Sequence, residues 1–274
     1  MNQAMWSHPA SLANIEALEQ RGVTMIGPDE GIQACGDVGP GRMEQPDSIV
    51  SKVSSMFQNG LLAGKKVVIT AGPTREALDP VRYISNHSSG KMGFGLAAAA
   101  VEAGAEVTLI SGPVAITPPE RCKVISIVSA QDMLDASLAT AAGADIFIAA
   151  AAVADYRAST IADQKIKKQG DSMTISLEKN PDIVSAVALA NPNLFVLGFA
   201  AETQDVEAYA REKLQRKNLS AIIANDVSRT DVGFNADDNE VSWIDRSSSV
   251  VFSKRSKAQL ARDIIEHLAK GHFH

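Results

Sequence analysis

Residues 66–110 read KVVITAGPTREALDPVRYISNHSSGKMGFGLAAAAVEAGAEVTLI. Their order indicates a strand at 66–71, an alanine-rich helix near 92–103 and a second strand at 105–111. A strand, a helix and a second strand form a βαβ unit, whose helix N-terminus offers free backbone N–H groups to an anion. The polar, glycine-containing run 85–93 leads into that helix. A nucleotide or a phosphorylated substrate is therefore the first ligand to expect at this loop.

Strands and helices alternate through most of the remaining chain. The stretch 146–150 is apolar throughout, as expected for a strand of a parallel sheet that helices cover on both faces. We predict an α/β fold, a doubly wound, mostly parallel, Rossmann-like sheet with helices on both faces and a C-terminal β-hairpin. The further predicted elements are strands at 123–128, 145–151, 194–199 and 220–225, helices at 130–142, 181–190 and 204–217, a hairpin of 240–245 with 250–253, and a closing helix to about Lys270.

The N-terminal segment does not continue this alternation. One helix, one short strand and a glycine-rich loop cannot close a hydrophobic core, which indicates the tail of something longer. We therefore divide the chain into a tail at 1–50, a linker at 51–63 and a main domain at 64–274. The elements predicted for the first part are a helix from Ser11 to Arg21, a strand at 23–26, a loop at 32–43 and a helix at about 46–58.

The composition is that of a globular protein with no exceptional bias. The chain has 274 residues, of which 45% are hydrophobic and 21% are charged. Its formal net charge of −6 argues against general binding to nucleic acid, which needs a broad basic surface. We see no apolar run long enough to span a membrane and no secretory signal, and the two cysteines form no disulfide framework or zinc pattern. We expect a cytoplasmic protein without nucleic-acid or membrane partners.

The run 85–93 contains the first candidate site residues. The Asn86 side chain can both donate and accept hydrogen bonds, and Gly90 and Gly93 permit a close approach of the backbone to a ligand. An ordinary loop with a helix cap would have the same composition, because serine and asparagine are preferred capping residues. Both interpretations remain open on spacing alone.

Small residues at strand ends suggest a second group of candidates. Ala149, Ala150 and Ala151 end a central strand, and open α/β sheets bind ligands at that edge. Asp155 would then project into the crevice, unless it lies in a surface turn. A similar strand end carries Phe199, which could stack on a base or belong to the core.

Lysines provide the positive charge for an anionic ligand. Residues 156–171 are predicted to form a mobile loop, and its Lys165 could close over phosphates, although lysine-rich loops are usually only solvated. Lys213 and Lys217 lie one helical turn apart and could reach one polyanion or simply face solvent. Asn180 is predicted as a helix N-cap, with Pro181 at the first helical position.

Taken together, these motifs resemble bacterial phosphopantothenate–cysteine ligase, the synthetase half of the bifunctional coenzyme A biosynthesis protein. The resemblance covers about residues 64–270, and the motifs occur in the order typical of that family. They are Ile69–Glu76, Asp79–Gly93, Ala151–Tyr156, Lys165–Lys168, Asn180–Ile183, Gly198–Thr203 and Lys217–Leu219.

The resemblance implies a ligation of 4′-phosphopantothenate with L-cysteine, with CTP as co-substrate and Mg²⁺ as cofactor. The substrate carboxylate attacks the α-phosphate and displaces pyrophosphate, and the cysteine amine then attacks the acyl-cytidylate and displaces CMP. The resemblance implies two catalytic residues, Lys165 at the α-phosphate and Asn86, which also binds the substrate, at the acyl carbonyl. The residues that it places around CTP are Ala149, Ala150, Ala151, Asp155, Lys165, Pro181, Asp182, Ile183, Val184, Phe199, Lys213 and Lys217.

The tail resembles part of the other half of the bifunctional protein, the flavin-dependent phosphopantothenoylcysteine decarboxylase. Residues 33–43 are similar to its substrate clamp, in which Cys35 would be the proton donor, and Asn2 falls in its substrate-binding motif. FMN is implied only for the complete decarboxylase half. The flavin-binding body would precede Met1, so we do not expect decarboxylation from this chain alone. The resemblance also implies a homodimer formed through the ligase domain.

Two other functions are compatible with parts of the sequence. Tyr209 and Lys213 have the Tyr-x-x-x-Lys spacing of short-chain oxidoreductases. The glycines at 90, 93 and 95, however, lie too far past the first strand for a dinucleotide fingerprint. A nucleotide-binding remnant that only oligomerises is the other alternative, and the presence of both Asn86 and Lys165 argues against it.

Overall fold

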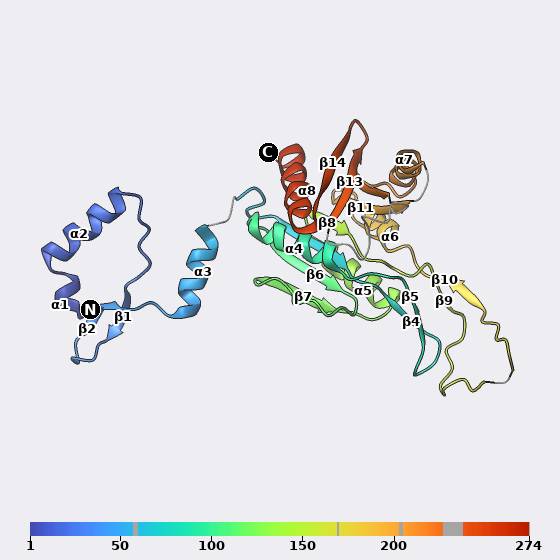
Figure 1. Cartoon of the computed structure of the whole chain (residues 1–274), viewed down its shortest axis with the longest axis horizontal. Helices are drawn as coiled ribbons and strands as arrows, with labels where there is room; N and C mark the ends of the chain where they lie inside the picture. The colour runs from blue at the N-terminus through green and yellow to red at the C-terminus, as the bar shows by residue number, and fades with distance from the viewer. Residues whose placement is uncertain (57–59, 169, 203–204, 227–237, 274) are drawn as a thin grey trace. The chain divides into compact units, whose positions relative to one another are not determined.

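A computed structural model describes residues 1–56, 60–168, 170–202, 205–226 and 238–273 (Figure 1). The chain forms two compact units, Met1–Gln58 and Asn59–His274. Each unit is described by itself below.

The first unit contains helices and one β-ribbon. The ribbon pairs β1 with β2 in antiparallel orientation, so the predicted loop at 32–43 is in fact part of a hairpin. The strand predicted at 23–26 is wrong: residues 23–28 have no regular structure, and Val23 and Met25 are exposed because no strand pairs with them. The elements are α1 (Gln3–Trp6), α2 (Pro9–Gln20), β1 (Asp29–Ile32), β2 (Val38–Arg42) and α3 (Pro46–Met56).

The second unit is built on an eight-stranded sheet with the order β14-β13-β12-β11-β8-β3-β6-β7. The six strands from β12 to β7 are parallel, whereas β13 and β14 form an antiparallel hairpin at one edge. This confirms the predicted α/β fold. The strands are β3 (Lys66–Ala71), β6 (Glu106–Ser111), β7 (Cys122–Ser126), β8 (Ile146–Ala149), β11 (Phe195–Glu202), β12 (Ala221–Asp226), β13 (Asp238–Asp245) and β14 (Ser249–Ser256).

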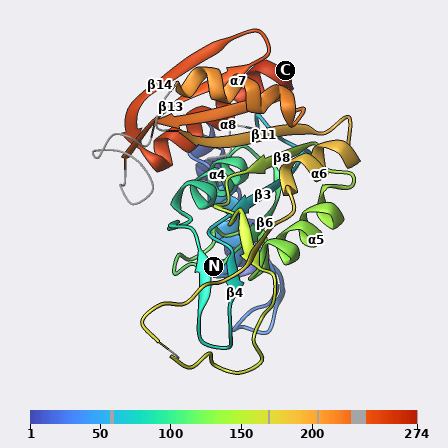
Figure 2. The same cartoon turned by 90° about the vertical axis from the view of Figure 1, so that its right-hand side faces the viewer.

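Helices cover both faces of this sheet (Figure 2). One hydrophobic core lies between the sheet and the helices α4 (Lys91–Glu102) and α8 (Lys257–His272). The other core contains side chains of α5 (Ala130–Ala141), α6 (Ile183–Ala190) and α7 (Val206–Arg216). Apolar residues on both faces explain why β3 and β8 read as nearly continuous apolar runs in the sequence.

The strand order reverses between β3 and β8. From β3 the chain proceeds outward through β6 to β7, and it then returns to β8 and continues in the opposite direction through β11 to β12. Such a reversal opens a crevice at the carboxyl ends of the two central strands, where open α/β sheets bind their ligands.

Two short ribbons, which the sequence analysis did not predict, extend from this carboxyl edge. β4 (Arg75–Ala77) pairs with β5 (Tyr83–Ser85), and β9 (Tyr156–Ala158) pairs with β10 (Leu177–Lys179). Part of the loop predicted at 156–171 is therefore a strand. Figure 1 shows both ribbons and the long β9–β10 connection projecting from the sheet.

The start of α6 also differs from the prediction. The N-cap is Asp182, whose side chain accepts a hydrogen bond from Ser185 N at 3.1 Å, and the helix begins at Ile183. Asn180 lies two residues before this N-cap and does not cap the helix; its Nδ2 donates to Ala154 O at 2.8 Å. Its backbone N–H also donates to Asp155 O at 2.9 Å, so Asn180 holds a neighbouring loop instead.

Gly93 allows α4 to lie directly against β3. A Cβ atom at Gly93 would be 2.5 Å from the Cβ of Ala71, whereas one at Gly95 would find its nearest neighbour at 3.4 Å. We expect Gly93→Ala to lower the free energy of unfolding in urea by about 1–3 kcal/mol, because α4 must move away from the sheet. Gly95→Ala is the control and should keep or raise stability, since alanine favours helix. Equal stability of both variants would contradict this explanation of the glycine.

Candidate functional site

A cavity of about 550 Å³ lies at the carboxyl edge of the sheet, where the strand order reverses. Its residues come from the loop before α4, the first turn of α4, the segment after β8, the ends of β11 and β12, the start of β13, and the helices α7 and α8. The lining residues are Asn86, His87, Ser88, Ser89, Gly90, Lys91, Met92, Gly93, Ala150, Ala151, Ala152, Val153, Asp155, Phe199, Ala200, Lys213, Asn225, Asn239 and Lys257.

Two buried threonines fix the segment that follows β8. Thr70 Oγ1 accepts a hydrogen bond from Ala151 N at 3.3 Å, and Thr74 Oγ1 accepts one from Ala154 N at 3.0 Å. These bonds hold the small residues of the cavity wall in place and leave space in front of them. The sequence analysis did not identify Thr70 or Thr74 as supports, because a single threonine in a strand or in the loop after it has no distinctive pattern.

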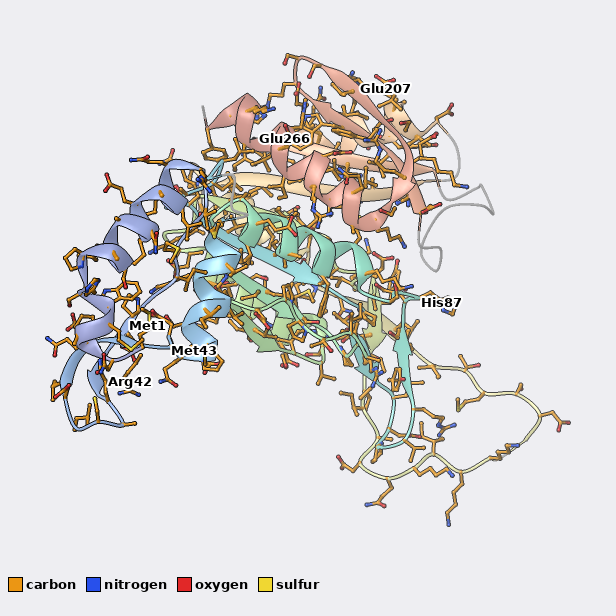
Figure 3. All side chains as sticks on the ribbon, turned by 60° about the vertical axis from the view of Figure 1, so that its left-hand side comes forward. Met1, Arg42, Met43, His87, Glu207 and Glu266 are labelled. Carbon is orange, nitrogen blue, oxygen red and sulfur yellow. The ribbon has the colours of Figure 1, made fainter. Side chains whose placement is uncertain are left out.

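Asn86 is held between two walls of the cavity. Its Nδ2 donates a hydrogen bond to Val153 O at 2.9 Å. The preceding residue, Ser85, donates from Oγ to Thr74 O at 2.7 Å and thereby fixes the start of the loop. The carboxamide of Asn86 is therefore oriented by the same segment that carries Asp155. Figure 3 labels His87, the next residue of this exposed loop.

The N-terminus of α4 faces the same cavity. Its N-cap is Gly90, which has a φ of 78° and makes no side-chain capping bond. Ser88 Oγ accepts a hydrogen bond from the N–H of this N-cap residue at 3.3 Å, so a serine of the run 85–93 contributes to the start of the helix, as the second interpretation of the run expects. The first helical N–H groups have no intrahelical acceptor, and together with the helix dipole they favour an anion.

The opposite wall carries cationic and amide side chains. Lys213 Nζ donates to Phe199 O at 3.2 Å, which places its ammonium at the end of β11. Lys257 and Asn239 are buried, and neither was identified as a candidate from the sequence. The buried Oδ1 of Asn225 has no hydrogen-bond partner in the described part of the chain. An unpaired buried oxygen is costly, so its presence here favours a ligand that donates to it.

Comparison with known proteins places this chain in a family. The model of the DNA/pantothenate metabolism flavoprotein C-terminal domain matches residues 62–272. The chain belongs to this family. A second model, described as Flavoprotein, matches residues 1–58.

Relatives and solved structures of the family agree with this assignment. The coenzyme A biosynthesis bifunctional protein CoaBC of Haemophilus influenzae is 52% identical over 98% of this chain and 67% of that protein. A crystal structure of the C-terminal domain of a CoaBC protein has a TM-score of 0.67 and 38% identity, and the match covers 78% of this chain and 98% of that one. The DNA/pantothenate metabolism flavoprotein of Streptococcus pneumoniae has a TM-score of 0.66 at 26% identity, over 76% of this chain and 99% of that one.

Several residues that the family resemblance assigned to the nucleotide do not line the cavity. Ala149 is buried in β8, and the segment 181–184 lies at the start of α6. Lys217 forms an ion pair with Asp182 at 2.9 Å. Burial acts to raise the pKa of Asp182, but the hydrogen bonds from Lys217 and Ser185 outweigh it and lower the pKa. These residues form a second polar cluster.

Lys165 also lies outside the cavity lining. It is exposed on the long connection between β9 and β10. The next residue, Ile166, is attached through its backbone to Asp79 and Arg82 of the β4–β5 connection. Lys165 therefore stands next to a fixed point of an otherwise irregular loop.

The two candidate residues of the first unit have local roles in the structure. Asn2 caps α1 by accepting a hydrogen bond from Met5 N at 2.9 Å. Cys35 is exposed, and its Sγ lies 3.5 Å from Asp37 Oδ2 and 3.8 Å from Gln33 Oε1. The amino group of Met1, labelled in Figure 3 with Arg42 and Met43, donates to Gly41 O at 2.9 Å.

No helix in the described ranges combines the length and the apolar character that crossing a membrane requires.

Proposed function

We propose that the second unit is a CTP-dependent phosphopantothenate–cysteine ligase of coenzyme A biosynthesis. The observation that carries this proposal is the cavity, in which the N-terminus of α4, Asn86 and the cationic side chains of Lys213 and Lys257 surround one space. A cavity with this charge suits substrates that carry phosphates and a carboxylate. Membership in a family with CoaBC relatives gives independent support.

In the first half-reaction, a carboxylate oxygen of 4′-phosphopantothenate attacks the α-phosphate of CTP, and pyrophosphate leaves. This step needs alignment of the two anions and neutralisation of their charge, and it needs no nucleophilic side chain. We assign the neutralising role to the ammonium of Lys165. Its loop would have to bring it to the cavity, because the exposed lysine lies outside the lining.

In the second half-reaction, the amine of L-cysteine attacks the acyl carbon of the acyl-cytidylate. The carbonyl oxygen becomes an oxyanion, CMP then leaves, and the amine loses a proton as the amide forms. We assign stabilisation of this oxyanion to the carboxamide of Asn86, which the bond to Val153 O already orients. A donor that is fixed before the reaction stabilises charge without reorganisation.

The nucleotide would contact side chains from several strand ends. We propose that Phe199 stacks on part of CTP, that Lys213 neutralises its phosphates, and that Ala150 and Ala151 leave room for it. The Asp182–Lys217 cluster and the backbone of 181–184 would recognise the cytosine edge. A pyrimidine contact at this helix start would use Asp182, which caps α6, and Lys217, which is paired with it.

We propose that Mg²⁺ would enter this cavity bound to the phosphates of the nucleotide. Within the described ranges, no three His, Cys, Asp or Glu side chains are arranged to hold a metal ion. Mg²⁺ is commonly bound by one or two carboxylates together with substrate phosphates, and Asp155 is the acidic side chain of the lining. When bound, the ion neutralises phosphate charge.

We further propose a cytoplasmic homodimer formed through the second unit. Two free thiols, Cys35 and Cys122, are in keeping with a reducing compartment. FMN would belong to the decarboxylase half, for which Cys35 and Asn2 are the candidate residues. The described elements of the first unit, three helices and one ribbon, offer no sheet on which a flavin could lie, so we derive no flavin step.

The test is pyrophosphate release by the purified chain with Mg²⁺ and 4′-phosphopantothenate, with CTP compared against ATP and with or without L-cysteine. We expect release with CTP that is sustained only when cysteine is present. Release with ATP alone would contradict the proposed cytosine site. No release with either nucleotide would overturn the proposed ligase activity.

A further inference from the structure

A single buried carboxylate connects the β4–β5 ribbon to the loop that carries Lys165. The Asp79 side chain has no solvent exposure. Its Oδ1 accepts hydrogen bonds from Val81 N at 2.8 Å and Arg82 N at 2.9 Å, which close the turn between β4 and β5. Its Oδ2 accepts one from Ile166 N at 3.1 Å, although Ile166 lies 87 positions away in the sequence.

Arg82 completes this attachment by holding the other backbone polar group of Ile166. Its Nε donates to Asp79 Oδ2 at 3.0 Å, and a terminal nitrogen forms an ion pair with the same carboxylate. That nitrogen also donates to Ile166 O at 2.9 Å. The N–H and the C=O of Ile166 are thus both held by one ion pair, which we call the Asp79–Arg82 clamp.

The surroundings of Asp79 favour its charged form, which the contacts of the clamp require. The hydrogen bond from Arg82 lowers the pKa of Asp79 far below its ordinary value, and the backbone N–H groups of Val81, Ile166 and Arg82 act in the same direction against burial. A buried carboxylate is tolerated only when its acceptor sites are satisfied. A nearby bond from Ala162 N to Leu78 O, at 3.0 Å, attaches the same loop again.

The clamp acts immediately beside the proposed charge-neutralising lysine. Lys165 precedes Ile166, so its backbone position is determined within one residue of a fixed peptide. An unattached loop would have to lose conformational entropy each time its lysine met the nucleotide. A loop that is clamped at Ile166 has fewer conformations to lose when its lysine meets the nucleotide.

We propose that Asp79 is a positioning residue for Lys165, which through the Asp79–Arg82 clamp delivers the lysine ammonium to the α-phosphate during activation. This inference rests on the proposed ligase function. It assigns a role to a residue that does not itself line the cavity.

Asp79→Asn is the most specific test of the clamp. The asparagine oxygen can still accept the hydrogen bonds from Val81 N and Arg82 N, whereas its Nδ2 cannot accept the one from Ile166 N. We expect the single-turnover rate of pyrophosphate release to fall about 100-fold, the size of effect that a small misplacement of a reacting group produces. Aminolysis of the acyl-cytidylate should change less than about twofold, because Lys165 acts before that intermediate exists. Asp79→Ala should slow activation at least as much.

Trypsin cleavage provides a readout that needs no substrate. Lys165, Lys167 and Lys168 are all exposed trypsin sites beside the clamp. We expect Asp79→Asn and Asp79→Ala to increase the rate of cleavage in this loop while the melting temperature of the unit, followed by circular dichroism, shows that it remains folded.

Glu178→Gln is the matched control. Glu178 accepts a hydrogen bond from Arg157 Nε at 2.8 Å across the β9–β10 ribbon, so this variant weakens an ion pair at the base of the same loop without touching Ile166. Both half-reactions and the cleavage rate should match those of the parent chain.

Three outcomes would overturn the inference. Faster cleavage with normal pyrophosphate release would show that the clamp exists but does not position Lys165. Equal slowing of both half-reactions would indicate a general structural role for Asp79. Absence of pyrophosphate release from the parent chain would remove the ligase function and the positioning role together, and the trypsin comparison would then show whether the clamp alone is correct.

Discussion

Lys165→Gln should abolish pyrophosphate release when the chain is mixed with CTP, Mg²⁺ and 4′-phosphopantothenate. Glutamine can still donate a hydrogen bond but carries no charge, so the variant removes mainly the neutralisation of the α-phosphate. Removal of one donor to developing charge typically costs 10²–10³-fold in rate. We expect a loss of about 10³-fold, because a full positive charge is removed, measured as the rate of pyrophosphate release in a single turnover.

Lys168→Gln is the control for this prediction. Both lysines are exposed on the same loop, but Lys168 is not adjacent to the clamped peptide of Ile166. Its substitution removes the same charge from the loop and should leave the rate within about twofold, since an exposed charge that makes no direct contact with the phosphates is screened by salt. If both variants release pyrophosphate at the parent rate, Lys165 has no part in activation.

The sequence predicted the sheet well because the physical signal was local. β3 and β8 are buried on both faces, so nearly every residue had to be apolar. The polar, glycine-containing run before α4 and the small residues after β8 marked the ligand edge. Asn86 and Asp155 were identified as candidates for this reason, and the structure brings both to one cavity. Their functional roles remain proposals.

Tertiary contacts explain what the sequence could not show. Asn180 is a residue type that often caps helices, but the helix begins two residues later than predicted and Asp182 caps it, while the side chain of Asn180 donates to Ala154 O in a neighbouring loop. Asn239 and Lys257 reach the cavity only because an antiparallel hairpin returns to the sheet edge. No local sequence pattern predicts that a hairpin will place these two residues at the cavity.

The second large effect is expected for Asn86→Asp, which should separate the two half-reactions. In the parent chain, Nδ2 of Asn86 donates to Val153 O at 2.9 Å. An aspartate would place a negative oxygen near that carbonyl, and it would oppose the oxyanion that forms when cysteine attacks. Activation uses Lys165 and should remain within about threefold, whereas product formation should fall at least about 100-fold. The acyl-cytidylate should therefore accumulate, and it can be followed by chromatography with mass detection.

Asn191→Asp separates this effect from a loss of stability. Asn191 Nδ2 donates to Val187 O at 3.0 Å at the end of α6, so the substitution breaks a bond of the same kind outside the cavity lining. The loss of that bond should lower the free energy of unfolding by about 1 kcal/mol and leave both half-reactions unchanged. If Asn86→Asp slows activation and product formation by the same factor, Asn86 only maintains the loop. Accumulation of the acyl-cytidylate in Asn86→Asp alone requires that its carboxamide acts after activation, at the carbonyl that cysteine attacks.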